Sequence, residues 1–355
     1  MNNLQFRQDL QEKAVSTIIK YNNGTLVLPM RSGKTFIGLK IASNFKKVLV
    51  SYPIETIKKG WISDAQEFGF DISHVIFTTH LSLSKHDLSQ FDCIILDELH
   101  DVSINNWNYI ALSTYKKLYG LTATPPNRGE KKSYMNMYCP IRYTKSMDET
   151  TGITNKDYEI IVHLIEPSEK KDIKLKSGKF WSEKAQIDFY ESKYQSTKSF
   201  SMMLMLIRAI QNSKTKFEYF KKLASTINRG LLFVETIEQC DNLSYPSVHS
   251  KNPESEYNLE QFKNGQIPIL SSIGKLKAGI TFKNLNTCII LHCYSSNNKA
   301  IQKIGRALNY VEGEKATIHI ICLNNTIDAQ WVQKGLADLD QSKIKRNNNG
   351  KLHNN

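Results

Sequence analysis

The chain has 355 residues, of which 40% are apolar and 23% are charged. This length exceeds what one ordinary hydrophobic core accommodates, so it predicts two domains of a globular protein. No apolar run approaches the roughly 18 residues of a membrane-spanning helix. The N-terminal MNNLQFRQDLQ lacks the apolar stretch of a signal peptide.

Charge and cysteine content indicate a partner and a compartment. The formal net charge is +13 and the pI is about 9.2. A basic excess of this size favours a polyanionic partner such as nucleic acid, although a solvated lysine-rich surface would give the same total. Six cysteines occur without a C-x-x-C pair, which suits a reducing cytosol better than a disulfide scaffold. We therefore expect a cytoplasmic protein.

The first third of the chain alternates short apolar runs with helical stretches. Five runs predict buried strands: GTLVLP, KKVLVSYP, HVIFTT, FDCIILD and KKLYGLTAT. Two intervening stretches, TFIGLKIASNF and the residues around WISDAQEFG, predict helices. This alternation predicts an α/β domain with a parallel sheet covered on both faces, which binds ligands at the carboxyl ends of its strands.

A second series of apolar runs predicts a second α/β domain: DYEIIVHLIE, RGLLFVET, IPILSS, NTCIILHCY and ATIHIICL. The intervening segment 166–230 is predicted to be helical and carries 14 Lys or Arg against 7 Asp or Glu, with Trp181, Tyr190 and Tyr194 interspersed. Basic and aromatic residues together suit a nucleic-acid surface; the alternative is a core-facing helix with solvated lysines. Residues 341–355 carry four positive charges and no acid, which predicts a disordered tail.

The segment LPMRSGKT, residues 28–35, lies between a predicted strand and a predicted helix. Gly33, Lys34 and Thr35 match the end of the phosphate-binding pattern G-x-x-x-x-G-K-[ST], whereas Leu28 occupies the first glycine position. Lys34 would reach the β- and γ-phosphates, and Thr35 would bind Mg²⁺. Arg31 crowds the turn, so we expect it in an allowed backbone conformation and pointing away from the loop, either as an additional cation or without a role.

The segment FDCIILDELH, residues 91–100, runs from four apolar residues directly into Asp97, Glu98 and His100. Carboxylates at the end of a buried strand are costly unless a cation or a proton transfer requires them. Asp97 fits an outer-shell partner of Mg²⁺, and Glu98 fits the base that orients an attacking water. The alternative is a pair of surface-turn acids.

Two later segments complete the set. In LYGLTATPP, residues 118–126, a strand leads into Thr122, Thr124 and a double proline that must leave regular structure. In IQKIGRALNY, residues 301–310, a helix would present Gln302 and Arg306 on one face. Arg306 could then reach the γ-phosphate across an interdomain cleft, as an arginine finger does.

The segment CIILHC, residues 288–293, contains the candidate ligands of a competing metal site, Cys288, His292 and Cys293. A strand directs neighbouring side chains to opposite faces, whereas metal ligands must converge, so a buried strand is the favoured interpretation.

The order MRSGKT, DELH, TATP and QxxGR resembles motifs I, II, III and VI of the superfamily 2 helicases and translocases, with a DEAH-like box. LQFRQDLQEKAV resembles the N-terminal motif whose glutamine reads adenine, here Gln11. VLVSYPIETIKKGW resembles motif Ia with the downstream tryptophan of Swi/Snf-type and phage repair translocases, here Trp61. FTTHLSL resembles motif Ic, and GLLFVET and SSIGKLKAGITF resemble motifs IV and V. The resemblance covers about residues 4–325.

The resemblance implies two tandem RecA-like domains, at 1–147 and 148–340, with ATP and Mg²⁺ between them and nucleic acid across their tops. It implies the following sites: catalysis by Glu98, Lys34, Arg306 and Gln302; ATP binding by Gln11, Arg31, Ser32, Gly33, Lys34, Thr35, Asp97, Gly279 and Arg306; Mg²⁺ binding by Thr35 and Asp97; coupling by His100, Thr122 and Thr124; and nucleic-acid binding by Pro53, Thr79, Thr236 and Ser272.

Three positions depart from the family pattern. Motif VI usually reads QRxGRxGR, but Asn309 occupies its last arginine position and Lys303 replaces the first. Motif V usually has an acid where this chain has Thr281. Arg306 would therefore be the remaining finger, unless Lys303 supplies the missing charge.

The expected function is a nucleic-acid-dependent ATPase that translocates on DNA or remodels it, by unwinding or annealing. Its contacts would be mainly to phosphates, which predicts strong salt dependence and little sequence preference. An RNA helicase is one alternative. The other is a nucleotide-gated binding protein with a slow ATPase, which Asn309 favours. The compact chain suggests a minimal motor, bacterial or phage-encoded.

Overall fold

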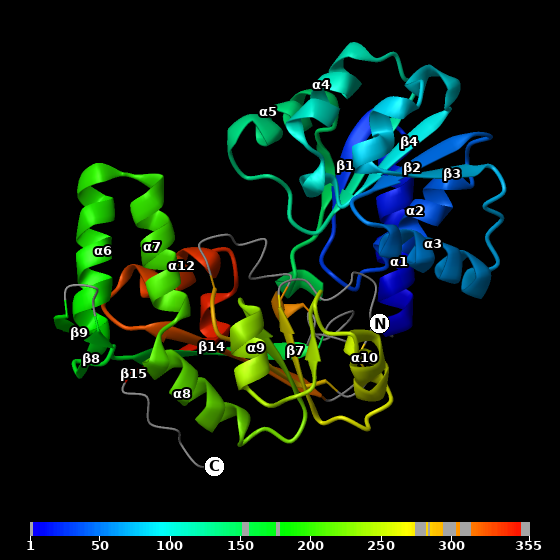
Figure 1. Ribbon diagram of the computed structural model, residues 1–355. Helices are drawn as coiled ribbons and strands as arrows, with labels where there is room; N and C mark the ends of the chain where they lie inside the picture. The colour runs from blue at the N-terminus through cyan, green and yellow to red at the C-terminus, as the bar shows by residue number, and fades with distance from the viewer. Residues whose placement is uncertain are drawn as a thin grey trace. The chain divides into compact units, whose positions relative to one another are not determined.

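The structure is a computed structural model that describes residues 3–150, 156–174, 178–273, 282, 285–293, 303–305 and 314–348 (Figure 1). The chain divides into two compact units: the first holds Met1–Asn155 and the second begins at Lys156. This division lies somewhat later than the boundary expected after residue 147. Each unit contains its own parallel sheet.

The sheet of the first unit has six strands in the order β3-β2-β4-β5-β1-β6, and every pairing is parallel. The strands are β1 (Asn23–Val27), β2 (Val48–Tyr52), β3 (Val75–Thr79), β4 (Cys93–Asp97), β5 (Leu118–Thr122) and β6 (Ile141–Thr144). The sequence predicted the first five. It missed β6, whose residues are largely exposed, because an exposed edge strand has no apolar run to reveal it.

Helices cover both faces of this sheet: α1 (Asn3–Ile18), α2 (Lys34–Ala42), α3 (Glu55–Phe68), α4 (Ile104–Leu112) and α5 (Gly129–Tyr138). Along β4, Cys93 and Ile95 belong to the core that includes α1, α2 and α3. Ile94 and Leu96 belong to the core on the other face, with residues of α4 and α5. Successive strand residues are therefore buried on alternate faces, which is why the central strands read as continuous apolar runs.

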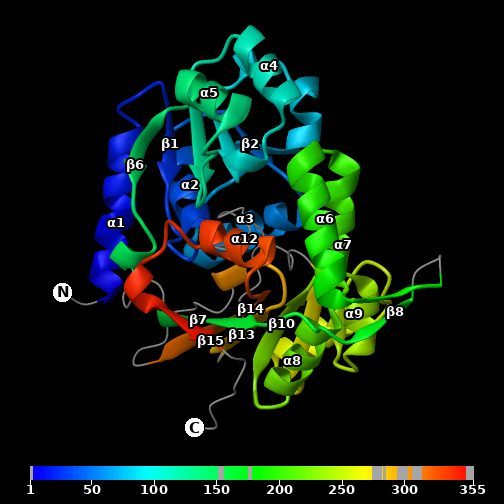
Figure 2. The ribbon, with the colours of Figure 1, turned by 90° about the vertical axis from the view of Figure 1, so that its left-hand side faces the viewer.

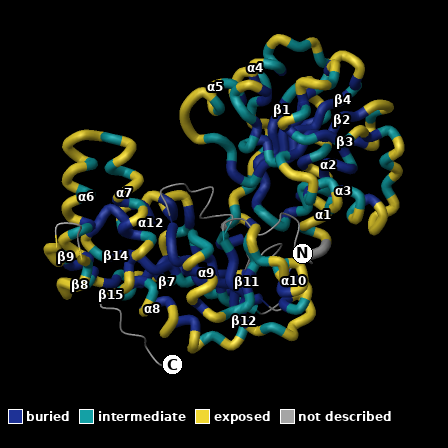
Figure 3. The backbone as a smooth tube through the Cα atoms, viewed as in Figure 1, coloured by how far each residue is buried: buried dark blue, intermediate teal, exposed yellow. Residues whose placement is uncertain are grey.

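The sheet of the second unit has seven strands in the order β11-β12-β10-β13-β14-β7-β15, again all parallel. They are β7 (Asp157–Ile165), β10 (Gly230–Val234), β11 (Ser247–Val248), β12 (Ile269–Ile273), β13 (Thr287–Ile290), β14 (Lys315–Leu323) and β15 (Ile344–Asn348). The tube coloured by burial shows the strands of this sheet as a largely buried layer (Figure 3).

Segment 166–230 begins with an antiparallel hairpin, β8 (Lys171–Lys174) and β9 (Phe180–Ser182), and continues as three helices. These are α6 (Glu183–Thr197), α7 (Phe200–Gln211) and α8 (Lys214–Ala224). Helices α6 and α7 lie side by side as a helical hairpin in both ribbon views (Figures 1 and 2). Within the described residues of this unit, the other α-helices are α9 (Ile237–Asn242), α10 (Ser255–Lys263) and α12 (Ile327–Gly335).

The prediction that the tail is disordered from residue 341 is wrong for its first eight residues. A short 3₁₀ helix, Gln341–Lys343, leads into β15, which pairs with β7. The basic residues of this segment have acidic partners: Lys343 Nζ lies 2.7 Å from Asp157 Oδ1, and Lys345 Nζ lies 2.7 Å from Glu159 Oε2. The charges that predicted disorder therefore match acids on the neighbouring strand. Residues 349–355 lie outside the described residues.

Candidate nucleotide site and its neighbours

The loop between β1 and α2 is closed by short-range hydrogen bonds. Ser32 Oγ donates to Pro29 O at 2.9 Å, and Leu28 N donates to Thr122 O at 2.9 Å, which ties the loop to β5. Gly33 adopts a left-handed backbone with φ 82° and immediately precedes α2. A side chain at Gly33 would overlap the amide of Gln11. The left-handed backbone therefore favours glycine at this position, and a side chain there would also displace the Gln11 amide.

Two predicted ATP-binding residues contact or shape the loop. Gln11 is 6% exposed, and its Nε2 donates to Ser32 O at 3.2 Å. Arg31 has φ 71°, a left-handed conformation that is sterically allowed but uncommon outside glycine. The prediction that Arg31 has a sterically allowed backbone conformation is confirmed. The conformation is the left-handed one, which is less favourable for a residue with a side chain.

Lys34 begins α2 and folds back over the loop. Its Nζ lies 3.4 Å from Leu28 O and 3.3 Å from Pro29 O. These are long, weak contacts to carbonyl oxygens, which a phosphate oxygen could replace. Thr35 follows in the first helical turn and is half-buried. The structure therefore brings both residues to the amino end of α2, where backbone N–H groups and the helix dipole attract anions.

Asp97 ends β4 and is 6% exposed. Its Oδ2 accepts a hydrogen bond from Trp61 Nε1 at 2.8 Å, and its Oδ1 accepts one from Glu98 N at 2.9 Å. Burial, and then the neighbouring Glu98 carboxylate, raise the pKa of Asp97 to about 6, while Lys34 opposes the shift. A carboxylate whose charge is this costly fits a site completed by a cation.

Trp61 is the residue of this site to which the sequence assigned no role. It is fully buried on α3, 36 positions before Asp97. Its ring packs so closely against Gly38 of α2 that any side chain at Gly38 would overlap it. The resemblance to motif Ia marked Trp61, but its contact depends on how α3 packs on the sheet, which sequence spacing does not reveal.

Glu98 and His100 lie where β4 turns into a 3₁₀ helix. Glu98 has φ 50°, in the left-handed region, and such strain often marks functional sites. His100 Nδ1 lies 3.5 Å from Glu98 Oε2 and 3.0 Å from Thr122 Oγ1. Thr122 Oγ1 in turn accepts from Thr124 N at 3.1 Å. The structure therefore joins the three predicted coupling residues in one chain that begins at Glu98.

The predicted nucleic-acid residues differ in their surroundings. Pro53 and Thr79 follow or end adjacent parallel strands, because Tyr52 and Thr79 are register partners, and both are half-buried. Thr236 caps α9, and its hydroxyl accepts from Gln239 N. Ser272 is 1% exposed within β12, and its assignment to nucleic-acid contact stays a prediction. The run ILSSI is buried almost throughout, so its polar residues do not mark a surface.

The predicted residues Gly279, Thr281, Gln302, Arg306 and Asn309 lie outside the described residues. Lys303 is described: its Nζ lies 2.7 Å from Glu235 Oε1 and 3.0 Å from His292 O. Its charge is therefore matched by a carboxylate of the same unit. This pairing weakens the alternative that Lys303 supplies the charge missing at Asn309.

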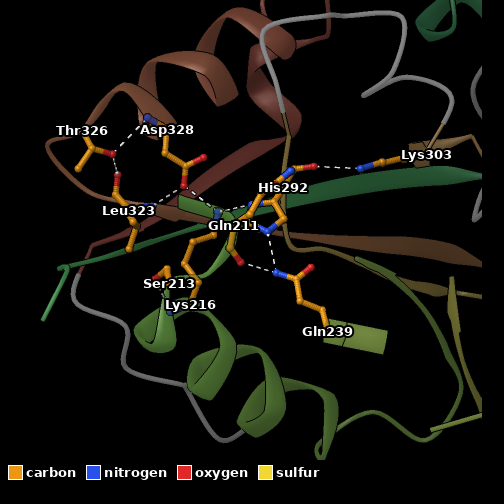
Figure 4. Close-up of polar contacts among 9 residues, drawn as sticks. All are labelled: Gln211, Ser213, Lys216, Gln239, His292, Lys303, Leu323, Thr326 and Asp328. Atoms are coloured by element: carbon orange, nitrogen blue, oxygen red, sulfur yellow. Dashed lines mark hydrogen bonds and ion pairs between the residues drawn. The ribbon is translucent and has the colours of Figure 1, made fainter. Parts of the chain in front are cut away.

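Lys303 borders a buried polar network in the second unit (Figure 4). Lys216 on α8 is 1% exposed, and its Nζ lies 2.7 Å from Asp328 Oδ2 and 3.2 Å from His292 Nδ1. Gln239 Nε2 lies 3.4 Å from His292 Nε2 and also donates to Gln211 O. Burial, followed by Lys216 and Lys303, holds the pKa of His292 well below its usual range. The network therefore contains a neutral imidazole between cations.

From the sequence, His292 was a candidate metal ligand together with Cys288 and Cys293. In the structure its imidazole lies in this polar network instead. Among the described residues, no group of three His, Cys, Asp or Glu side chains is arranged to hold a metal ion. Within the same residues, no helix is long and apolar enough to cross a membrane.

Two family models match the chain in tandem. "Type III restriction enzyme, res subunit" matches residues 6–127, within the first unit. "Helicase conserved C-terminal domain" matches residues 203–310, which begin and end in the second. A relative from Sulfurisphaera tokodaii, "DNA 3'-5' translocase XPB2", is 23% identical over 389 residues, covering 96% of this chain and 84% of its own length.

Solved structures share the fold. The chain is similar to the "ATP-dependent Type ISP restriction-modification enzyme LlaBIII bound to DNA", with a TM-score of 0.62 and 15% identity. That match covers 96% of this chain but spans only 31% of the larger enzyme. The Pyrococcus furiosus Hef helicase domain matches with a TM-score of 0.52 and 14% identity over 92% of this chain and 96% of that one.

These likenesses and the two parallel sheets show tandem RecA-like domains. From the two family models, the translocase relative and the motif order, the chain belongs to the superfamily 2 helicases and translocases, a family of ATP-hydrolysing enzymes.

Proposed function

We propose that this chain is an ATP-dependent translocase that acts on DNA. The relative named as a DNA 3'-5' translocase and the DNA-bound neighbour support DNA as the partner. The formal net charge of +13 suits a phosphate backbone. The direction 3′ to 5′ is part of the proposal, because the relative's name states it.

The observation that carries the proposal is the environment of Asp97. A buried carboxylate with a pKa raised to about 6 stands at the carboxyl end of β4, in the same sheet edge as the Gly33–Lys34 loop. Thr35 and Asp97 would hold Mg²⁺, Asp97 through the outer shell. The ion would supply positive charge that stabilises the phosphoryl group during transfer.

In the proposed mechanism, the residues of the loop bind the nucleotide and the residues at the end of β4 activate water. Lys34 exchanges its long contacts with loop carbonyls for the β- and γ-phosphates, while Ser32 and Gly33 lend backbone N–H groups and Gln11 reads adenine. Glu98 orients the attacking water and accepts its proton. His100, Thr122 and Thr124 transmit the state of Glu98 to the following loop.

The second unit would supply the remaining groups. We assign the arginine finger to Arg306 rather than Lys303, because Glu235 already pairs with Lys303. Gln302 and Gly279 complete the proposed nucleotide contacts. Pro53, Thr79 and Thr236 are the proposed phosphate contacts, and they predict binding with little sequence preference.

The test is an ATPase assay with no polymer, single-stranded DNA, duplex DNA and matched RNA, each across a salt series. DNA should stimulate turnover, with an effect that falls steeply as salt rises. Lys34→Ala should abolish turnover while circular dichroism stays that of the wild type, because Lys34 is not a core residue. Stronger stimulation by RNA than by DNA would identify RNA as the substrate instead of DNA. No stimulation by any polymer would refute the proposal.

Direction is tested separately by displacement of streptavidin from biotin at either DNA end. Faster loss from the 5′ end would support movement 3′ to 5′. Displacement that proceeds equally well with a non-hydrolysable ATP analogue would show a nucleotide-gated binding protein instead of a motor.

A further inference from the structure

The helical hairpin of α6 and α7 carries apolar side chains that the described residues leave uncovered. Phe200, at the start of α7, is 76% exposed, and Leu204 and Met205 are 37% and 41% exposed. Large apolar side chains gathered on one projecting element commonly mark an interaction site. The hairpin is seen beside the sheet of its unit in Figures 1 and 2, and its exposed turn in Figure 3.

The exposed side chains share one face of α7. Phe200, Leu204 and Arg208 follow one another at intervals of four residues, so they form a stripe along the helix. The opposite face of α7 packs into the unit's core, where Leu206 and Ile210 are fully buried. The stripe is therefore not needed to hold the hairpin on its unit.

Charge is segregated along the hairpin. The stretch from Ser192 to Phe217 contains five Lys or Arg and no acid. Of these, Lys216 is buried against Asp328 and Lys214 pairs with Asp172. The remaining three, Lys193, Lys198 and Arg208, form no salt bridge within the described part of the chain.

Acids gather at the foot of the hairpin. A cavity of about 500 Å³ there is lined by Asp172, Glu183 and Glu218, and also by Met205 and Arg208 of α7. The turn is therefore cationic and aromatic, whereas the foot is mixed. Lys193 and Lys198 also lie over the rings of Phe189 and Tyr194, at 5.9 and 5.6 Å from the ring centroids, so cations and aromatic faces alternate near the turn.

We propose that the hairpin turn, defined as Lys193, Lys198, Phe200 and Leu204, binds a single strand of nucleic acid. Phe200 stacks on an unpaired base, and the two lysines bind flanking phosphates. A phenyl ring can stack only on a base that has left the duplex, so the turn recognises single strands in preference to duplex. From Phe200 to Leu204 the helix rises about 6 Å, enough for roughly one nucleotide of extended strand.

This inference rests on the proposed function, because it names where the translocated strand touches the second unit. The charge pattern argues for a polyanion over an apolar protein groove, since Lys193 and Lys198 lie close to the exposed Phe200 in the sequence and form no salt bridge within the described residues. A membrane surface is the other polyanion that this pattern could meet, and the experiment includes it.

The test measures the affinity of the full chain for a fluorescent oligo-dT strand and for a blunt duplex, by anisotropy. Phe200→Ala should weaken single-strand binding about tenfold and leave duplex binding within twofold. Phe200→Trp should restore affinity, because the larger ring still stacks. Leu112→Ala is the matched control: Leu112 is 90% exposed on α4 of the first unit, and its loss should change neither affinity.

The cations are tested by Lys193→Ala with Lys198→Ala. Removing two phosphate contacts should reduce the slope of log affinity against log salt by about 1.4 for a single strand. An unchanged slope would overturn their assignment. Wild-type affinity in Phe200→Ala would overturn the stacking contact. The proposed function would still stand in that case if DNA stimulates the wild-type ATPase and the Lys34→Ala variant does not hydrolyse ATP.

Two further results would also overturn the inference. One is loss of binding to anionic phospholipid vesicles in Phe200→Ala with unchanged oligo-dT binding, which would assign the turn to a membrane surface. The other is absence of nucleic-acid binding by the wild-type chain, which would remove the proposed function as well.

Discussion

Trp61 Nε1 donates a hydrogen bond to Asp97 Oδ2 at 2.8 Å, although the two residues lie 36 positions apart. The indole thereby fixes the orientation of a carboxylate that the proposed mechanism needs for Mg²⁺. Partners that orient a metal-binding group in this way typically contribute 10- to 100-fold in affinity or activity.

Trp61→Phe should therefore keep the packing of α3 but lower ATP turnover about tenfold or more, with a raised requirement for Mg²⁺. Steady-state ATPase rates across a Mg²⁺ titration would measure this. Trp107→Phe is the control, because Trp107 is fully buried in the same unit and its Nε1 has no hydrogen-bond partner among the described residues. An equal loss in both variants would show that ring packing, not the hydrogen bond, is responsible.

Glu98→Gln should bind ATP with wild-type affinity and hydrolyse it about 10²- to 10⁴-fold more slowly, because the amide cannot accept a proton. Equilibrium binding of a fluorescent ATP analogue and single-turnover hydrolysis separate the two effects. Asp101→Asn changes a neighbouring acid by the same chemistry and should keep most of the activity. Wild-type turnover in Glu98→Gln would show that another group activates the water.

Thr122→Val removes the hydroxyl that His100 Nδ1 contacts at 3.0 Å and that Thr124 N uses as an acceptor. We expect streptavidin displacement to fall about tenfold while DNA-stimulated ATP turnover changes less than threefold, because the link to the following loop is broken and the phosphate site is kept. Thr122→Ser should restore displacement, since it returns the hydroxyl. A parallel fall of both activities would place Thr122 in hydrolysis rather than in coupling.

Lys216→Met should destabilise the second unit by roughly 3–5 kcal/mol, because it leaves the Asp328 carboxylate buried without its cation. Urea denaturation followed by fluorescence would measure this. Adding Asp328→Asn to Lys216→Met should recover part of the loss. Lys214→Met is the matched control: its pair with Asp172 is exposed, so its removal should leave the unfolding midpoint nearly unchanged. Equal midpoints for the two single variants would contradict a structural role for the buried pair.

His163 and His319 face each other across β7 and β14, with His163 Nε2 3.0 Å from His319 Nδ1. Burial lowers the pKa of each to about 4. Since the unfolded chain takes up these protons near pH 6.5, the imidazoles stabilise the folded state above pH 6.5 and lose that contribution as the pH falls toward 4. The urea midpoint should therefore drop between pH 7 and pH 5.

The double variant His163→Gln and His319→Gln should show a smaller drop over the same interval. His80 in the first unit is shifted in the same direction and remains in both proteins, so the difference between them isolates the pair. An identical drop in wild type and variant would assign the pH dependence to other groups.

The residues that the sequence could identify are those whose chemistry is local. Gly33, Lys34 and Thr35 are adjacent in the sequence, as are Asp97 and Glu98. Buried parallel strands can be identified in the sequence as continuous apolar runs. The contacts that it could not supply join distant positions: Trp61 with Asp97, and Lys216 with Asp328, which are 112 positions apart. Such pairs depend on tertiary packing, which one sequence does not encode in any spacing.

The error at the edge strand β15 has the same origin. Its basic residues predicted disorder because their acidic partners lie on β7, far earlier in the chain. Ser272 was given a nucleic-acid role by the resemblance to motif V, and its 1% exposure within β12 was equally hidden in the sequence. In both places the neighbours of a residue, and not its own chemistry, decide its environment.

The position of β7 between β14 and β15 has a consequence for synthesis of the chain. Strand β7 ends at Ile165, but both of its partners begin after residue 314, and the pair Lys345–Glu159 joins residues 186 positions apart. At typical translation rates, β14 leaves the ribosome about 8–30 s after β7. During that interval β7 is an apolar strand with two open edges, so the nascent second unit should depend on holding chaperones that the first unit, whose six sheet strands all precede Asn155, does not need.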